Sequence, residues 1–307
     1  MKNAEASLKF RQRTLLELVA GNVASTTSER KTQQRESWNL GERDAKRPKS
    51  ITGDACAPPQ TLKVKWDGSE QINDLVLDDQ GSVLSYMPDF LTAQETRALW
   101  RDLVSSDSVV PWEQGRIRLY GKEFEERRLT CYFGEEWTDL QYSGRLVRPV
   151  PFDGAECPQS VRRLRDAVVG RTGVPFDSCL ANWYRNSHDR IGWHSDDERL
   201  YGRAPVIAAI SIGATRDFQI RVKPRLAAQL TPLVADAGER KAVTLPVRSG
   251  SLLIMSGQMQ RWWDHAVPPR KSAQNHAPLW QEGRISLTFR RVVAPSQNRV
   301  ATHGGGP

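Results

Sequence analysis

The sequence predicts an α+β protein whose body is a β-sandwich or jelly roll. Two helical patterns come first, and a series of short segments rich in β-branched and aromatic residues follows them. Gly, Pro, Asn and Asp separate these segments, as turns between short strands require. The chain has 307 residues, which accommodates one β-rich domain with tails at both ends.

The helices are predicted from caps and apolar spacing. Thr92–Glu95 fits a capping box, and Leu99 and Leu103 continue an apolar face behind it. A second helix is expected within residues 158–173, beginning near Pro158. Its apolar stripe comprises Val161, Leu164, Val168 and Val169.

The strands are predicted within the segments "ANWYRN", "PVIAAISIG", "RDFQIRVK", "KAVTLPVR", "GSLLIMSG" and "RISLTFRRVV". The last segment alternates most clearly, because three apolar residues from Ile285 to Phe289 interleave with polar ones. Residues 223–241 are basic and proline-bearing, and we expect a long loop or insert there.

The composition favours an anionic partner. The formal net charge is +8 and the isoelectric point about 9.5, so nucleic acid is the first candidate, although basic tails on an ordinary soluble protein would have the same effect. Four scattered cysteines favour a reducing compartment. We expect neither a signal peptide nor a membrane span, and we expect a monomer.

The ends of the chain differ from its centre. Residues 1–80 are polar and poor in aliphatics, so we predict a disordered N-terminal region, a folded domain over 81–294 and a disordered tail over 295–307. Lys46–Lys49 reads either as a nuclear import signal or as a solvated charge run, so the nucleus is expected, with the cytoplasm as the alternative. Gln12–Ala20 resembles peptides that bind sliding clamps.

A metal site is predicted at His194 and Asp196. In an extended segment, residues i and i+2 point the same way, so this imidazole and carboxylate can converge on one ion. His265 follows another predicted strand and is the best candidate for a third ligand. Two histidines and one carboxylate form the open-sided site of non-haem Fe(II) oxygenases. The alternative is that each is part of an ordinary polar loop.

Arg284 and Arg290 lie on one face of the strand in "RISLTFR". If this face points into a small barrel, two buried guanidiniums require an anionic partner, and a small dicarboxylate would satisfy both. The alternative is that both side chains are exposed on an edge strand.

Taken in order, "NWY…HSD…GSLLIM…DHAVP…RISLTFR" resembles the AlkB family of Fe(II)- and 2-oxoglutarate-dependent dioxygenases, and within it the eukaryotic members that repair alkylated nucleic acid. The resemblance runs from about Leu84 to Val293. It implies a double-stranded β-helix, a jelly-roll relative, with supporting helices. By motif position it implies Fe(II) ligands at His194, Asp196 and His265, and 2-oxoglutarate contacts at Asn182, Tyr184, Arg284 and Arg290.

The same resemblance implies a nucleotide-binding face. Asp197 matches the residue that contacts the exocyclic amine of the target base, and Tyr120 falls where duplex-acting relatives place an aromatic wedge. Lys122 and Arg128 would lie near the phosphate backbone or the flipped base. The sequence departs from the family pattern at Asp264, before the metal histidine, and in the acidic cluster of Glu123, Glu125 and Glu126.

The resemblance implies an enzyme that uses Fe(II), 2-oxoglutarate and O2 to demethylate N1-methyladenine and N3-methylcytosine in DNA, and in RNA as a second substrate. Oxidation of the N-methyl group would release formaldehyde and restore the base. The alternatives are an RNA-mark demethylase, a protein hydroxylase or a non-catalytic jelly-roll module. We expect the remaining histidines, His188, His276 and His303, to lie outside the site.

Overall fold

The computed structural model describes residues 67–119, 122–138, 140–142, 145–234, 242–270 and 282–293. The interpretations of Gln12–Ala20, Lys46–Lys49 and the tail at 295–307 lie outside these residues. Within them, the helices are all too short or too polar to cross a membrane.

The predicted boundary at residue 81 is too late. Strand β1 (Ile72–Val76) lies within the segment predicted to be disordered, and it pairs with β2 (Ser82–Met87) in antiparallel fashion. The apolar residues Ile72, Leu75 and Leu77 are buried. This apolar pattern is short, and the composition of the N-terminal region as a whole is polar, so the sequence does not indicate a strand there. Burial of these apolar side chains stabilises the pairing of the strand with the edge of the sheet.

Both predicted helices are present. Helix α2 (Ala93–Val104) begins with the capping box, in which the Thr92 hydroxyl accepts from the Glu95 N–H and the Glu95 carboxylate accepts from the Thr92 N–H. Helix α3 (Gln159–Thr172) ends at Gly173, whose φ of 70° is a left-handed conformation that suits glycine.

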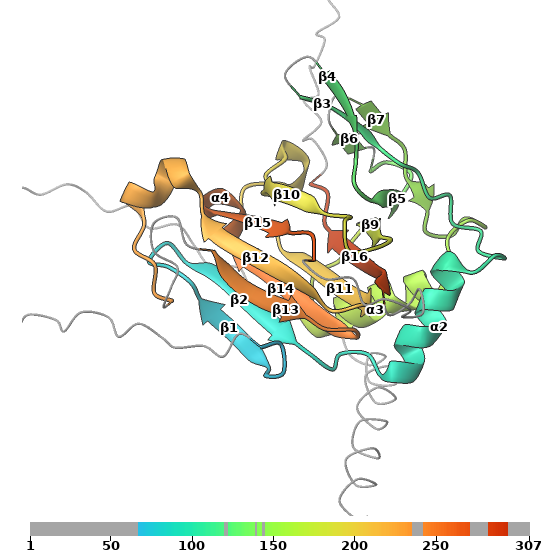
Figure 1. The fold of residues 1–307 in the computed structure, drawn as a ribbon, viewed down its shortest axis with the longest axis horizontal. Coiled ribbons are helices and arrows are strands. Elements are labelled where there is room, and N and C mark those ends of the chain that lie inside the picture. Colours follow the sequence, from blue (N-terminus) through green and yellow to red (C-terminus); the bar gives the residue numbers. More distant parts are fainter. Residues whose placement is uncertain are drawn as a thin grey trace, which may run out of the picture. The chain divides into compact units, whose positions relative to one another are not determined.

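The larger sheet has eight strands in the order β1-β2-β14-β11-β16-β9-β5-β8 (Figure 1). All neighbours are antiparallel except β5 and β8. Six of its strands are β5 (Leu129–Gly134), β8 (Val150–Pro151), β9 (Ser178–Tyr184), β11 (Ile207–Gly213), β14 (Ser251–Gly257) and β16 (Arg284–Arg290).

The smaller sheet has four strands in the order β10-β15-β12-β13, and short helices lie in connections that lead into or out of these strands. The strands are β10 (Ile191–His194), β12 (Arg216–Val222), β13 (Val243–Val247) and β15 (Trp263–Val267). The short helices are η1 (Arg199–Tyr201), η2 (Pro224–Gln229) and α4 (Met259–Trp262). Two hairpins lie beside β5: β3 (Arg116–Leu119) with β4 (Lys122–Glu125), and β6 (Leu140–Tyr142) with β7 (Arg145–Val147) (Figure 1).

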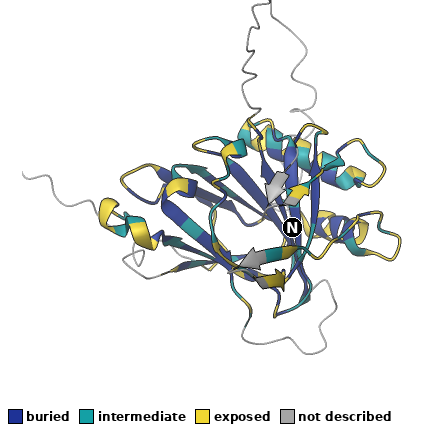
Figure 2. Ribbon diagram, turned by 90° about the horizontal axis from the view of Figure 1, so that it is seen from above, coloured by how far each residue is buried: buried dark blue, intermediate teal, exposed yellow. Residues whose placement is uncertain are grey.

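Two apolar cores fix this arrangement. One core contains side chains from both sheets, including Leu253 of β14 and Ile220 of β12, so the sheets face each other as in a jelly roll. The other lies between the larger sheet and the helices, with Leu103 of α2 packed in the same cluster as Leu287 of β16. Buried residues accordingly run along the strands, and exposed ones gather at turns and helix surfaces (Figure 2). The predicted double-stranded β-helix with supporting helices is confirmed.

Candidate iron and 2-oxoglutarate site

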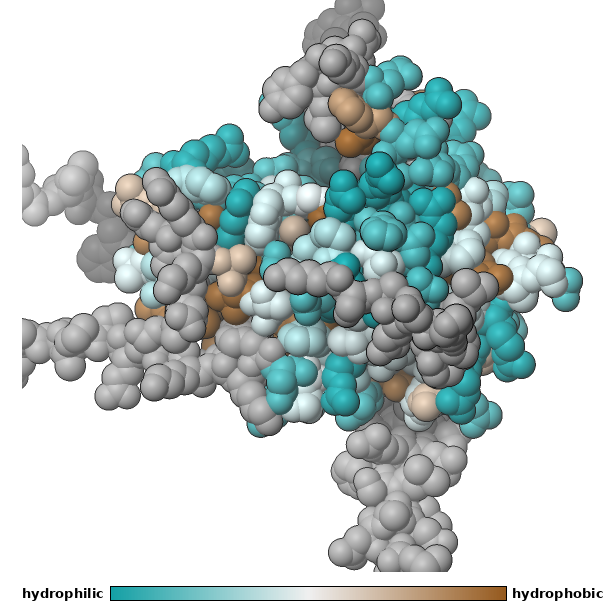
Figure 3. All heavy atoms as spheres, in the orientation of Figure 1, coloured by the Kyte–Doolittle hydropathy of each residue, from teal (hydrophilic) through white to brown (hydrophobic). Residues whose placement is uncertain are grey.

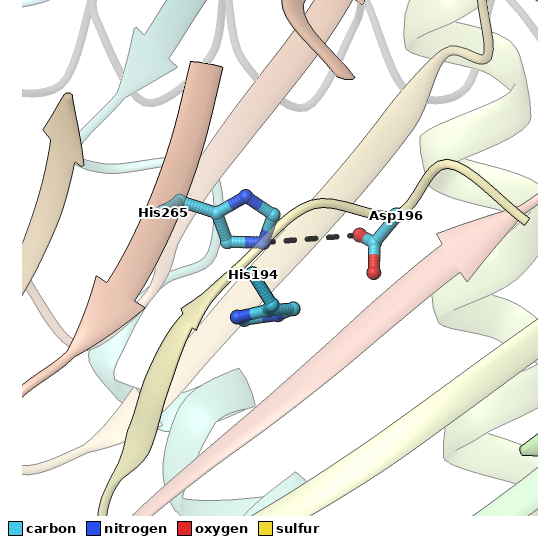
Figure 4. A group of neighbouring side chains, drawn as sticks. All are labelled: His194, Asp196 and His265. Atoms are coloured by element: carbon cyan, nitrogen blue, oxygen red, sulfur yellow. Dashed lines mark ion pairs between the residues drawn. The ribbon is translucent and has the colours of Figure 1, made fainter. Parts of the chain in front are cut away.

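The three predicted metal ligands come together. His194 ends β10 and lies opposite His265 of the antiparallel strand β15, and Asp196 follows β10 by two residues. One potential ligand atom from each residue lies within 4.8 Å of the others. His265 Nε2 is 3.9 Å from Asp196 Oδ2, and the two imidazole rings are 4.2 Å apart between centroids (Figure 4). A single cation between these atoms would contact all three side chains.

The protonation states suit a cation. Burial, reinforced by the neighbouring His194, lowers the pKa of His265 to about 3, and burial also lowers the pKa of His194. Burial opposes ionisation of Asp196, but Arg290 and the two histidines outweigh it and lower its pKa to about 2. At neutral pH the cluster therefore presents two neutral imidazoles and one carboxylate, which are the metal-binding forms.

Arg284 and Arg290 point inward, so the edge-strand alternative is wrong. Both are buried, because β16 lies in the middle of the larger sheet with β11 on one side and β9 on the other. In register with β9, Arg284 lies opposite Tyr184 and Ser286 lies opposite Asn182. The predicted cosubstrate residues therefore share one cavity wall, and that cavity is also lined by all three metal ligands.

The donor set fits Fe(II) and 2-oxoglutarate. Among the described residues that line this cavity, five buried polar atoms have no hydrogen-bond partner: Arg284 Nε and Nη1, Arg290 Nε, Asp196 Oδ2 and Glu198 Oε2. Leaving such atoms unsatisfied is costly, and an anion beside the guanidiniums with a cation beside the Asp196 carboxylate would satisfy those of Arg284, Arg290 and Asp196. Arg290 Nη2 already lies 3.0 Å from Asp196 Oδ1, which leaves Oδ2 directed to the histidines.

Arg128, predicted to lie near the phosphate backbone or the flipped base, lines the same cavity as the metal ligands. It is buried, and its Nε donates to Asn182 Oδ1 over 2.8 Å, while its Nη2 lies 2.8 Å from Glu126 Oε1. Arg128 occupies the amide oxygen, and the Asn182 amide nitrogen donates to the Leu180 carbonyl over 3.4 Å, which leaves its second N–H for a cosubstrate oxygen. In the sequence, Glu126 belongs to an acidic cluster with Glu123 and Glu125. No pattern in the neighbouring residues indicates that its side chain is buried beside Arg128.

Asp197 lies beside the metal centre, in a depression that also includes His194 and Ser195. Its side chain is 56% exposed, and Lys223 Nζ donates to its Oδ2 over 3.1 Å. Lys223 itself is buried, at the start of the segment 223–241 that was predicted to be a loop or insert. Tyr120 lies outside the described residues, and Lys122 begins strand β4.

The other residues singled out in the sequence fall around the site. His188 is exposed in the turn after β9, as predicted, whereas His276 and His303 lie outside the described residues. Asp264 lines the same depression as His194 and Asp197, and it pairs with Arg221 over 3.4 Å. The Arg221 guanidinium in turn lies 4.2 Å from the ring centroid of Trp193, which is partly exposed.

A jelly roll that holds two histidines and one carboxylate beside two buried arginines defines a mononuclear, open-sided iron site. The family model described as "2OG-Fe(II) oxygenase superfamily" matches residues 83–290. The chain is 34% identical over 225 residues to "DNA oxidative demethylase ALKBH2" of Arabidopsis thaliana, covering 69% of this chain and 67% of that protein.

Two human proteins are similar to the same degree. "Alpha-ketoglutarate-dependent dioxygenase alkB homolog 3" is 34% identical over 205 residues, covering 67% of this chain and 64% of that protein. "DNA oxidative demethylase ALKBH2" is 34% identical over 178 residues, covering 58% of this chain and 61% of that protein. The chain therefore belongs to the 2OG-Fe(II) oxygenase superfamily and, within it, to the AlkB family. It is a dioxygenase dependent on Fe(II), 2-oxoglutarate and O2.

Proposed function

We propose that this dioxygenase removes methyl groups from N-alkylated bases, such as N1-methyladenine and N3-methylcytosine, in DNA and in RNA, as part of alkylation-damage repair. The observation that carries the proposal is a single cavity in which the iron ligands adjoin two buried arginines, with Asp197 exposed beside His194. The names of the similar plant and human proteins support the same reaction.

Two groups of residues have different roles: one would hold Fe(II), and the other would bind and position 2-oxoglutarate. His194, Asp196 and His265 would hold Fe(II), and Arg284 and Arg290 would hold 2-oxoglutarate by charge-assisted hydrogen bonds. Fe(II) held there would supply the oxidising chemistry: one oxygen atom of O2 would enter the N-methyl group, and the other would enter succinate as 2-oxoglutarate loses CO2. The resulting N-hydroxymethyl group breaks down to formaldehyde and the restored base.

Substrate capture depends on a base leaving its stack. Methylation at adenine N1 or cytosine N3 blocks Watson–Crick pairing, so the damaged base unstacks at lower cost than a normal one. The Asp197 carboxylate can accept a hydrogen bond from an exocyclic amine that reaches the iron centre. The net charge of +8 would add a salt-sensitive attraction to the phosphate backbone. On the face shown in Figure 3, hydrophilic residues cover much of the described surface, and apolar residues show between them.

The test is a demethylation assay read by mass spectrometry. Matched oligonucleotides would carry N1-methyladenine or N3-methylcytosine in single- and double-stranded DNA and RNA, with Fe(II), 2-oxoglutarate and O2 supplied. We expect loss of the methyl mass together with formaldehyde release. If 2-oxoglutarate is converted to succinate but no oligonucleotide loses its methyl group, the substrate is of another class, and a protein side chain becomes the next candidate.

A further inference from the structure

Lys223 is a buried cation next to the exposed carboxylate of Asp197. It follows strand β12, where its backbone N–H donates to the Trp262 carbonyl, and its side chain is only 6% exposed. Its Nζ donates to Asp197 Oδ2 over 3.1 Å and to the Gln260 carbonyl over 2.8 Å. The ammonium group is therefore held in place by two acceptors on different segments.

Gln260 links this lysine to the metal centre. Its side chain is buried, and its Oε1 accepts from the backbone N–H of Asp196 over 2.9 Å. Gln260 lies in α4, directly before the strand that carries His265. Lys223, Gln260 and the segment Asp196–Asp197 thus form one hydrogen-bonded unit, which fixes the position of the ammonium relative to the iron ligands.

The pair has a consequence for the electrostatic field at the base. A buried ammonium is costly without a counter-charge, and within the described residues Asp197 is the carboxylate that forms an ion pair with Lys223. The pairing offsets part of the negative potential that Asp197 would otherwise project toward a base beside His194. The exposed Arg225 lines the same depression and adds little, because exposed charges are screened by salt, and Asp264 there is paired with Arg221.

Alkylated bases differ in charge. N3-methylcytosine is a cation at neutral pH and has an exocyclic amine, whereas N3-methylthymine is neutral and has a carbonyl oxygen at the same position. An unpaired carboxylate would favour the cation strongly, and a carboxylate paired with an ammonium would favour it less. The pair also provides an N–H donor beside the acceptor, so both exocyclic groups can find a partner.

We propose that Lys223 is a specificity-determining residue, which offsets the charge of Asp197 and so broadens the enzyme from cationic to neutral alkylated bases. The inference rests on the proposed function. Lys223 acts on selectivity between bases, because it stands beside the base-reading carboxylate and not among the iron or 2-oxoglutarate ligands.

The experiment measures kcat/KM for single-stranded DNA carrying N3-methylcytosine and for the matched N3-methylthymine strand. The ratio of the two values is taken on each variant, so losses in metal content or folded fraction cancel. Lys223→Met keeps the aliphatic stem and removes the charge, and we expect it to raise the ratio in favour of N3-methylcytosine about tenfold. Lys223→Arg retains the charge, and we expect its ratio to stay within about twofold of the wild-type value.

The partner substitution completes a double-mutant cycle. Asp197→Asn leaves the ammonium uncompensated beside the base, so the ratio should fall below the wild-type value. The double variant Lys223→Met with Asp197→Asn removes both charges, and its ratio should return toward the wild-type value.

An unchanged ratio in Lys223→Met would overturn the proposal. If Lys223→Met demethylates neither strand, Asp197→Asn provides the test. An unchanged ratio in Asp197→Asn would then overturn the proposal. Failure of the proposed function looks different, because the wild-type protein would then demethylate neither strand while still converting 2-oxoglutarate to succinate.

Discussion

His194 and His265 occupy paired positions on the antiparallel strands β10 and β15, with ring centroids 4.2 Å apart. Residues paired across antiparallel strands project to the same face, so the register itself brings both imidazoles into the space between the sheets. Asp196 needs no strand of its own, because it follows His194 by two residues in an extended segment. Two strands therefore supply the whole metal-binding set.

Replacing His265 by alanine should abolish the iron site. With one of three ligands lost, we expect uncoupled conversion of 2-oxoglutarate to succinate to fall by at least about 100-fold, since losing even an outer partner of a metal ligand typically costs 10- to 100-fold. The variant should also lose the rise in Tm that Fe(II) or a substitute divalent ion causes in the wild-type protein. His188→Ala is the matched control, because His188 is exposed in a nearby turn. Equal metal-dependent stabilisation in both variants would refute the assignment.

Replacing Arg284 by methionine should weaken cosubstrate binding. A hydrogen bond to a charged group contributes about 1.5–3 kcal/mol, so the KM for 2-oxoglutarate should rise about 10- to 100-fold. Binding of the divalent ion should persist, because Arg284 bonds to Ser211 and not to a metal ligand. Steady-state succinate formation over a range of 2-oxoglutarate concentrations measures the effect. An unaltered KM would mean that the buried guanidinium serves the fold alone.

Replacing Arg128 by methionine separates two roles for this residue. If Arg128 orients the Asn182 amide, the KM for 2-oxoglutarate should rise several-fold in the absence of any nucleic acid. If it acts as a nucleic-acid contact, as the sequence predicted, only reactions with oligonucleotide should change. Arg127→Met is the matched control, since Arg127 is the exposed neighbour. The measurement is uncoupled 2-oxoglutarate turnover for both variants.

The metal-free protein should lose stability as the pH falls from about 6.5 toward 3. His265 binds a proton near pH 6.5 when unfolded but only near a pKa of about 3 when folded, so the unfolded state holds more protons in this window. Protonation therefore favours unfolding, and the lowered pKa of His194 acts in the same direction. The lowered pKa of Asp196 causes a further loss of stability at lower pH, as the pH falls from 3.8 to its folded pKa of about 2.

Thermal unfolding in chelator at several pH values measures this dependence. His265→Gln should show a shallower fall in Tm above pH 4 than the wild-type protein, because the buried imidazole of His265 is gone. The same slope in both proteins would show that other groups cause the acid sensitivity.

Local patterns in the sequence determined much of the fold. The capping box at Thr92–Glu95 and the alternation in Arg284–Arg290 depend on residues a few positions apart, so their geometry is set within one turn or one strand. The spacing of His194 and Asp196 is likewise a local pattern, because the two residues are two positions apart. His265 was the best candidate for the third ligand because it follows a predicted strand, and the order of motifs matched to a known family supported that assignment.

Tertiary structure alone decided how buried charges are paired. Arg128 bonds to Asn182 from 54 positions away, and Lys223 bonds to Asp197 from 26 positions away. The sequence indicated the burial of neither side chain, because a buried charge depends on a counter-charge that sheet order and loop packing place beside it. The residues of the iron centre could therefore be predicted from the sequence. The partners of Asn182 and Asp197, which are Arg128 and Lys223, could be identified only in the tertiary structure.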